Sequence, residues 1–204
     1  MDKITKTLHD HYQSTFVSNG ETAKGVDWRD KETMELRFQK MFEIKCDDKV
    51  SSWLDVGCGY GGFGLWLHEK ARQDHYSGVE VVSELADSAI KKFDKSSILK
   101  GDFLELEIPK KFDYVICNGI LTQKLSNSLL EMDQYSFKLI EKMFAIAEKG
   151  IAFNIMSSYV NFFAPNLYYK NPAEVFVNCA SRFGSKIKID QSYGLYEFTT
   201  YIYK

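Results

Sequence analysis

The stretch Leu54–Gly64, LDVGCGYGGFG, contains five glycines directly behind an apolar run. The run VSSWLDV that leads into it predicts a buried strand, and GLWLHEKAR after it predicts a helix. Glycines between a strand and a helix let a ligand approach the backbone, and Gly57, Gly59 and Gly62 have the spacing G-x-G-x-x-G. A tight turn that binds nothing has the same spacing. The loop therefore predicts a strand–turn–helix unit, and further residues are needed to identify a ligand.

Strand-like and helix-like segments alternate after residue 49, and residues 133–148 predict a long helix. This alternation predicts parallel βαβ units in an open, doubly wound sheet of the Rossmann-like α/β class. The end of the chain differs, because the strand-like runs SKIKIDQSY and YEFTTYIYK are separated only by Gly194 and Leu195. So short a connection allows only an antiparallel hairpin. We therefore expect a parallel sheet that ends in an antiparallel edge.

The segment before the first predicted strand has a helical pattern. Residues 3–17 and 31–44 predict amphipathic helices, and Asp30 is expected to cap the second of them. We expect residues 1–48 to form an N-terminal helical cap that belongs to the same domain as residues 49–204.

Composition is that of an ordinary globular protein. Of the 204 residues, 45% are apolar and 26% are charged, and the formal net charge of −2 does not indicate nucleic-acid or anionic-membrane binding. No apolar run reaches the roughly 20 residues that span a bilayer, and the N-terminus lacks a signal-peptide core. The four cysteines form no CxxC pair. We expect free thiols, no metal site and a cytoplasmic location.

Three acidic residues indicate the kind of ligand. Glu80 ends the next predicted strand, 23 residues after Gly57, where it can accept hydrogen bonds from the hydroxyls of a ribose. Asp55 would repel a pyrophosphate at the glycine loop but suits the ammonium or sulfonium side of S-adenosylmethionine. Asp102 and Phe103 follow the third strand and can bond the amino edge and cover the face of an adenine. Together these residues favour S-adenosylmethionine over a dinucleotide.

The combined motifs resemble those of the class I S-adenosylmethionine-dependent methyltransferases. LDVGCGYG, the acid in GVEV, GDF and the strand FDYVICNGI carry the resemblance, which covers about residues 50–204. It implies a seven-stranded sheet of order 3-2-1-4-5-7-6, with S-adenosylmethionine as cofactor and S-adenosylhomocysteine as product. The site residues that it implies are Asp55, Gly57, Gly59, Gly61 and Asn118 for the methionine part, Glu80 for the ribose, and Val81, Asp102 and Phe103 for the adenine.

Residues outside these motifs are further candidates, each with a structural alternative. Arg37 can pair with the carboxylate of the cofactor or lie exposed on its helix. Trp28 can cover the site or attach the cap to the core. The loop NFFAPNLYYKNP follows the fifth predicted strand, at the carboxyl edge of the sheet. Its aromatic residues Phe162, Tyr168 and Tyr169 can form an acceptor pocket, dock the loop or make a dimer contact.

These features predict methyl transfer to oxygen or nitrogen of a small-molecule acceptor by in-line displacement. Positioning and exclusion of water supply most of the acceleration in such a reaction, so no catalytic residue is assigned. RNA or protein methylation, a non-catalytic S-adenosylmethionine-binding sensor or partner protein, and an NAD-linked oxidoreductase are the alternatives. Neither a nucleic-acid partner nor a membrane is expected, and the chain is expected to be a monomer or a homodimer.

Overall fold

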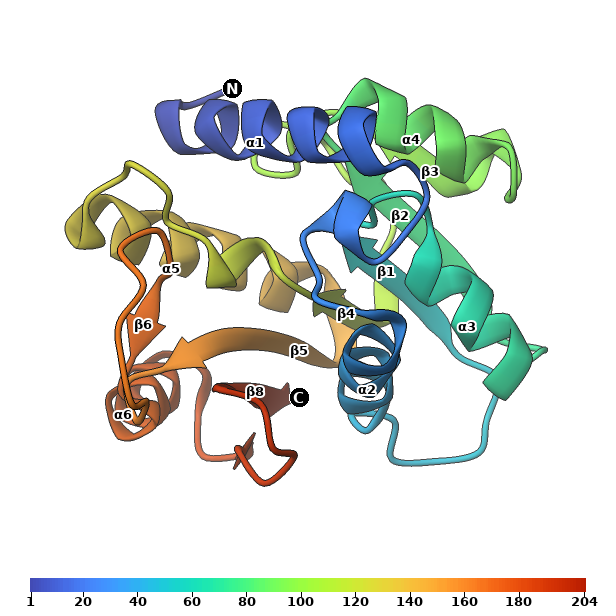
Figure 1. The fold of residues 1–204 in the computed structure, drawn as a ribbon. Coiled ribbons are helices and arrows are strands. Elements are labelled where there is room, and N and C mark those ends of the chain that lie inside the picture. The colour runs from blue at the N-terminus through green and yellow to red at the C-terminus, as the bar shows by residue number, and fades with distance from the viewer.

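Figure 1 shows the computed structural model, which describes residues 1–204. The strands are β1 (Ser52–Val56), β2 (His75–Glu80), β3 (Ile98–Lys100), β4 (Phe112–Cys117), β5 (Ala147–Ser157), β6 (Tyr169–Lys170), β7 (Ile187–Asp190) and β8 (Glu197–Tyr203). The helices are α1 (Lys3–Asn19), α2 (Lys31–Phe42), α3 (Gly62–Lys70), α4 (Ser83–Ile90), α5 (Leu129–Ile146) and α6 (Pro172–Phe183). Short 3-10 helices are η1 (Lys24–Val26), η2 (Lys95–Ser97) and η3 (Ile120–Thr122).

The strands form one mixed sheet in the order β3-β2-β1-β4-β5-β8-β7, and the two-residue β6 pairs with the end of β5. Strands β1 to β5 pair in parallel, whereas β8 is antiparallel to both β5 and β7. This is the order 3-2-1-4-5-7-6 when β6 is left out of the numbering. The Rossmann-like α/β fold with a C-terminal antiparallel hairpin is therefore confirmed. The short β6 was not predicted, because two extended residues inside a loop carry no strand pattern.

Apolar side chains fill the space on both faces of the sheet. One cluster of 24 buried residues joins the sheet to α1, α5 and α6, and a second cluster of 17 joins it to α2, α3 and α4. Parallel strands covered in this way leave only their ends free. A ligand can therefore meet the sheet at the edge where β1, β2 and β4 end.

Helix α1 lies across this edge, beside α4 (Figure 1), and also contacts α5. It buries only three of its 17 residues. Polar contacts also join it to its neighbours, since Gln13 Nε2 donates to Glu84 Oε1 of α4 at 2.6 Å and Lys3 Nζ donates to Glu131 Oε1 of α5 at 2.7 Å. The first helix is thus a cover that Ile4 and Leu8 attach to the core and that polar contacts join to α4 and α5.

Both helices expected near the N-terminus are present, with α1 two residues longer and α2 two residues shorter than predicted. Asp30 caps α2 as expected, because its Oδ1 accepts a hydrogen bond from the Thr33 N–H at 2.8 Å. None of the helices combines the length and the apolar composition required to cross a bilayer.

Candidate functional site

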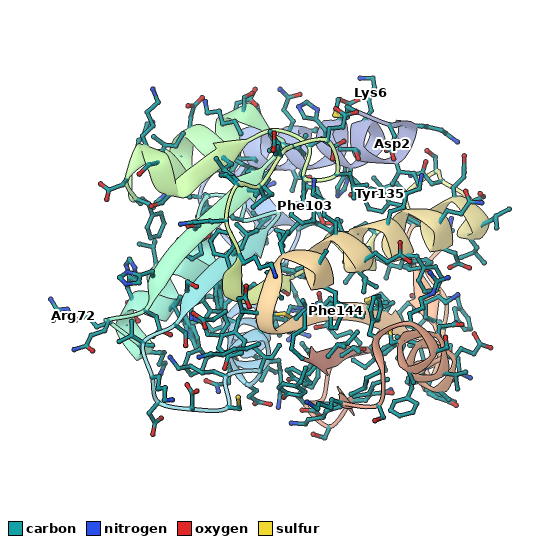
Figure 2. The ribbon with its side chains drawn as sticks, turned by 180° about the vertical axis from the view of Figure 1, so that it is seen from behind. Asp2, Lys6, Arg72, Phe103, Tyr135 and Phe144 are labelled. Carbon is teal, nitrogen blue, oxygen red and sulfur yellow. The ribbon has the colours of Figure 1, made fainter.

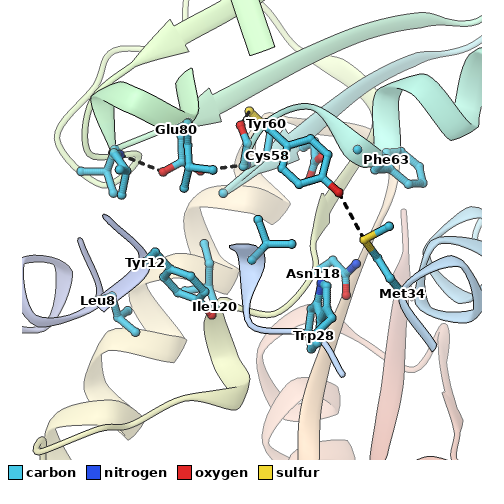
Figure 3. A pocket seen from close by; sticks show the side chains of 18 of the residues that line it. Leu8, Tyr12, Trp28, Met34, Cys58, Tyr60, Phe63, Glu80, Asn118 and Ile120 are labelled. Atoms are coloured by element: carbon cyan, nitrogen blue, oxygen red, sulfur yellow. Dashed lines mark hydrogen bonds between the residues drawn. The ribbon is translucent and has the colours of Figure 1, made fainter. Parts of the chain in front are cut away.

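A cavity lies at the carboxyl ends of β1, β2 and β4, the position where open α/β sheets bind ligands. The glycine loop forms one side, α1 a second, and the segment from η1 to α2 a third (Figure 3). Fourteen of its 21 lining residues are hydrophobic, so the cavity is mostly apolar. The larger apolar side chains are Leu8, Tyr12, Trp28, Met34, Phe38 and Phe63, and the polar side chains include Thr5, Asp55, Glu80 and Asn118.

Two glycines bring the loop backbone against the cavity. Gly57 has a φ of +74°, and a Cβ added to it would lie 2.5 Å from Ile120 Cδ1. Gly59 has a φ of +57°, and its N–H donates to Glu80 Oε2 at 2.8 Å. Residues with a side chain rarely adopt this left-handed backbone. The glycine spacing therefore serves a backbone turn that faces the cavity directly.

Glu80, at the end of β2, is buried with its carboxylate aimed along the glycine loop (Figure 3). Its two oxygens accept the N–H groups of Gly59 and Val82, each at 2.8 Å. Burial raises the pKa of this carboxyl group, and the backbone hydrogen bonds oppose that rise. Each carboxylate oxygen has more than one lone pair, so Glu80 can accept further hydrogen bonds from a ligand.

Asp55, in β1, is the second carboxylic acid of the lining and is buried. Its Oδ2 accepts a hydrogen bond from the Tyr76 hydroxyl at 3.1 Å. Burial raises the pKa of Asp55 to about 7, although the bond from Tyr76 lowers it, and the nearby Glu80 charge raises it further. A cation beside Asp55 would favour its ionised form.

The raised pKa of Asp55 predicts a pH-dependent stability. Between about pH 4 and pH 7 the folded chain holds a proton that the unfolded chain has released, so the free energy of unfolding falls as pH rises through this range. The loss amounts to about 4 kcal/mol, at 1.36 kcal/mol for each pKa unit. Asp55→Asn keeps an oxygen for Tyr76 and removes the titration. Urea unfolding of both proteins should show that, from pH 5 to pH 8, the free energy of unfolding falls more in the wild type than in the variant. An equal change in the two proteins would contradict this prediction.

Asn118 follows β4 and supplies an unpaired acceptor. Its Oδ1 is buried and has no hydrogen-bond partner. A buried carbonyl oxygen without a donor costs free energy, so a donor on a ligand is the expected partner. Together with Asp55 and Glu80 it gives the lining three acceptor groups, and no lysine, arginine or histidine lines the cavity. This set suits a ligand with hydrogen-bond donors and a positive charge, and disfavours a pyrophosphate.

A narrow extension of the cavity lies between the ends of β2 and β3 and helix α5. Val81, Asp102 and Phe103 line it, as does Tyr135, which projects from α5 toward α1 (Figure 2). Asp102 Oδ1 accepts the Leu104 N–H at 2.9 Å, which fixes the carboxylate at the start of its turn. The structure thus brings together the three residues that the resemblance implies for an adenine.

Two residues predicted for the cofactor do not line the cavity. Gly61, with a φ of +84°, is the N-cap of α3 and turns away. Arg37 points from α2 to Glu197, and its Nε lies 3.0 Å from both carboxylate oxygens. It is neither exposed nor in the cavity, and its guanidinium lies over the ring of Trp28, with 4.1 Å between Cζ and the ring centroid.

Of the aromatic residues predicted for an acceptor pocket, Trp28 lines the cavity and the three in the loop after β5 do not. Phe162 is 70% exposed. Tyr168 is buried in the core, where its hydroxyl donates to Asp133 of α5. Tyr169 lies in β6, and its hydroxyl accepts the Ala164 N–H at 3.1 Å. Tyr168 docks the loop onto the domain, whereas the Tyr169 side chain makes its contacts within the loop.

The side chains that α1 and α5 contribute to the cavity are not predicted from the sequence motifs. Leu8 and Tyr12 project from α1 (Figure 3), and Tyr135 from α5. Burial raises the pKa of both tyrosines, so their hydroxyls are neutral. Thr5, Leu8 and Tyr12 lie three and four residues apart, on one helix face, which is the signal that could have identified the α1 residues. No local signal indicates that α1 packs over the cavity.

Comparisons with known proteins agree with this geometry. The family described as "Methyltransferase domain" matches residues 54–135, which include the glycine loop, Glu80, Asp102 and Asn118. A protein of Mycobacterium tuberculosis (strain ATCC 25618 / H37Rv), named "Putative methyltransferase Rv1506c", is 28% identical over 153 residues, which are 74% of this chain and 91% of that protein.

Two solved structures share the fold over nearly the whole chain. Magnesium protoporphyrin IX methyltransferase from Synechocystis PCC 6803, with bound S-adenosylhomocysteine, has a TM-score of 0.67 at 13% identity, covering 98% of this chain and 99% of that one. The 1,6-didemethyltoxoflavin-N1-methyltransferase of Burkholderia thailandensis, with 1,6-didemethyltoxoflavin and S-adenosylhomocysteine bound, has a TM-score of 0.64 at 17% identity, covering 100% and 91%.

Proposed function

We propose that this chain is a class I S-adenosylmethionine-dependent methyltransferase and that it methylates an oxygen or nitrogen of a small molecule. The observation that carries the proposal is the mostly apolar cavity at the strand ends, with Asp55 and Glu80 beside the glycine loop. Two structural neighbours are named as methyltransferases of magnesium protoporphyrin IX and of 1,6-didemethyltoxoflavin, which supports a small-molecule acceptor.

The cavity residues fit S-adenosylmethionine by their chemistry. The cofactor carries an ammonium, a sulfonium and one carboxylate, so its net charge is positive, and the two acids of the lining complement it. We assign the ribose hydroxyls to Glu80 and the ammonium to Asp55 and to the unpaired Oδ1 of Asn118. We assign the adenine to the narrow extension lined by Val81, Asp102 and Phe103.

The chain itself has a limited chemical task. When bound, the cofactor supplies a methyl group on a positively charged sulfur, which is already activated for attack. The residues of the cavity therefore need to hold and orient two molecules and to keep water out. Trp28, Met34 and Phe38 provide apolar walls on the side formed by the segment from η1 to α2, where we place the acceptor. Tyr12 and Leu8 of α1 close the cavity from the solvent side.

The proposed function is tested first by binding and then by transfer. Calorimetric titrations with S-adenosylmethionine and with NAD should show saturable binding of the first ligand only. The enzyme is then incubated with a methyl-labelled cofactor and a fractionated metabolite extract, and mass spectrometry identifies the labelled product. Label in a compound of low molecular mass is the expected result. Label confined to RNA or protein would overturn the small-molecule assignment, and binding without any transfer would indicate a sensor.

A further inference from the structure

A buried acid on β8, Glu197, lies outside the cavity but is linked to it. Its side chain is 1% exposed, and both of its oxygens lie 3.0 Å from Arg37 Nε. Asn154, on β5 and fully buried, donates from Nδ2 to Glu197 Oε1 at 3.2 Å. Glu197 therefore joins α2 to the centre of the sheet.

One arm of this network reaches the turn after β4. Asn154 Oδ1 accepts the N–H of Gly119 at 2.8 Å, and Gly119 has a φ of +105°. Gly119 directly follows Asn118, whose unpaired oxygen is in the cavity lining. The hydrogen bond from Gly119 to Asn154 thus fixes the peptide that carries Asn118.

The other arm reaches Trp28. The Arg37 guanidinium lies over the Trp28 ring at 4.1 Å, and its Nη1 donates to the Thr33 carbonyl oxygen at 3.0 Å. The edge of the same ring abuts Gly119 so closely that a Cβ there would lie 2.7 Å from Trp28 Cζ2. The two arms therefore meet where Trp28 and the turn at Gly119 form adjoining parts of the cavity wall.

We propose that Glu197 is a positioning residue, which holds Trp28 through Arg37 and the Asn118–Gly119 turn through Asn154. Well-packed apolar side chains stabilise a fold about as well as a buried ion pair, so stability alone does not account for this pair. The Arg37–Glu197 pair and the Asn154 amide instead fix the orientation of the groups that they bond, because hydrogen bonds are directional. Testing this role by ligand binding rests on the proposed function, because it assumes that the cofactor and the acceptor lie against this part of the cavity wall.

Glu197→Gln tests the proposal, because glutamine can still accept from Asn154 but no longer balances the Arg37 charge. We expect the dissociation constant for S-adenosylhomocysteine, measured by calorimetry, to rise about tenfold. The fluorescence of Trp28 is obtained as the difference between spectra recorded with and without the Trp28→Phe substitution. This fluorescence should also change in ligand-free Glu197→Gln. A direct role for Arg37 on the cofactor carboxylate predicts the opposite, since the freed guanidinium would tighten binding. Unchanged or tighter binding would overturn the proposal.

Asp190→Asn is the matched control. Asp190 of β7 pairs with Lys40 of α2 at 3.0 Å, and the two side chains are 10% and 14% exposed, but the Lys40 ammonium lies over the ring of Tyr193 and not of Trp28. We expect its melting temperature to fall while the dissociation constant stays within about twofold of wild type. An equal loss of binding in both variants would show that destabilisation alone explains the effect.

If Glu197→Gln does not fold, the double variant Arg37→Met/Glu197→Met removes both charges at similar volume. The ligand-free fluorescence of Trp28 should then shift toward that of a more mobile, more hydrated indole. An unchanged spectrum would overturn the positioning role. This readout needs no ligand, so it remains decisive even if the wild-type protein binds no S-adenosylhomocysteine, a result that would refute the proposed function instead.

Discussion

Replacement of Glu80 by glutamine is expected to weaken the binding of S-adenosylmethionine by about 100-fold. The carboxylate accepts two backbone N–H groups, at Gly59 and Val82, and has lone pairs left for the ribose hydroxyls. Glutamine offers one oxygen, and its amide nitrogen would face a backbone donor. Hydrogen bonds to a charged group contribute about 1.5–3 kcal/mol each. The loss of the two bonds from the ribose hydroxyls therefore corresponds to about 3 kcal/mol of binding free energy.

Calorimetric titration with the cofactor measures this effect, with Glu69→Gln as the control. Glu69 lies on the exposed side of α3, so the control makes the same chemical change outside the cavity. Its affinity should equal that of the wild type. Wild-type affinity in Glu80→Gln would show that the ribose does not lie at the end of β2, and the assignment of the cavity would fail.

Replacement of Gly119 by alanine is expected to lower the melting temperature by about 8 °C and to impair cofactor binding. The backbone is in the left-handed region at a φ of +105°, and the new methyl group would lie 2.7 Å from Trp28 Cζ2. Backbone strain costs about 1 kcal/mol and displacement of a packed ring about 2 kcal/mol more. For a chain of this length each kcal/mol lowers the melting temperature by about 2–4 °C.

Gly184→Ala separates the two contributions. Gly184 ends α6 with a φ of +90°, but a Cβ there would have no atom within 4 Å. The Gly184→Ala variant should therefore show the backbone strain alone. Its melting temperature should fall less than that of Gly119→Ala, and its cofactor affinity should be normal. Equal losses at the two positions, measured by thermal unfolding, would show that the contact with Trp28 is unimportant.

The fold could be predicted because strands, turns and the closing hairpin all have local patterns. The element bounds were less accurate. The helix expected at 133–148 begins at Leu129, where Ser128 and Glu131 form a capping box. The capping pattern S-x-x-E was present in the sequence. Leu129 and Leu130 are 55% and 68% exposed, so the apolar periodicity that predicted the helix begins only after them.

The site could be predicted in part because the carboxyl ends of parallel strands meet at one edge. Asp55, Glu80 and Asn118 are all strand-end residues, and the structure brings them together. Side chains on helices depend on tertiary packing instead. The partner of Arg37 is Glu197, 160 residues away, and no local pattern reveals so distant a pairing.

The attachment of α1 has a consequence for how molecules enter and leave the cavity. Because the helix buries Ile4 and Leu8 in the core and is also held by polar contacts, its release has to expose those side chains and break those contacts. We expect the residence time of a bound molecule to depend on how often this helix undocks. Dissolved salt screens the pair of Lys3 and Glu131 and so promotes that undocking. We therefore expect ionic strength to act on product release rather than on the methyl-transfer step.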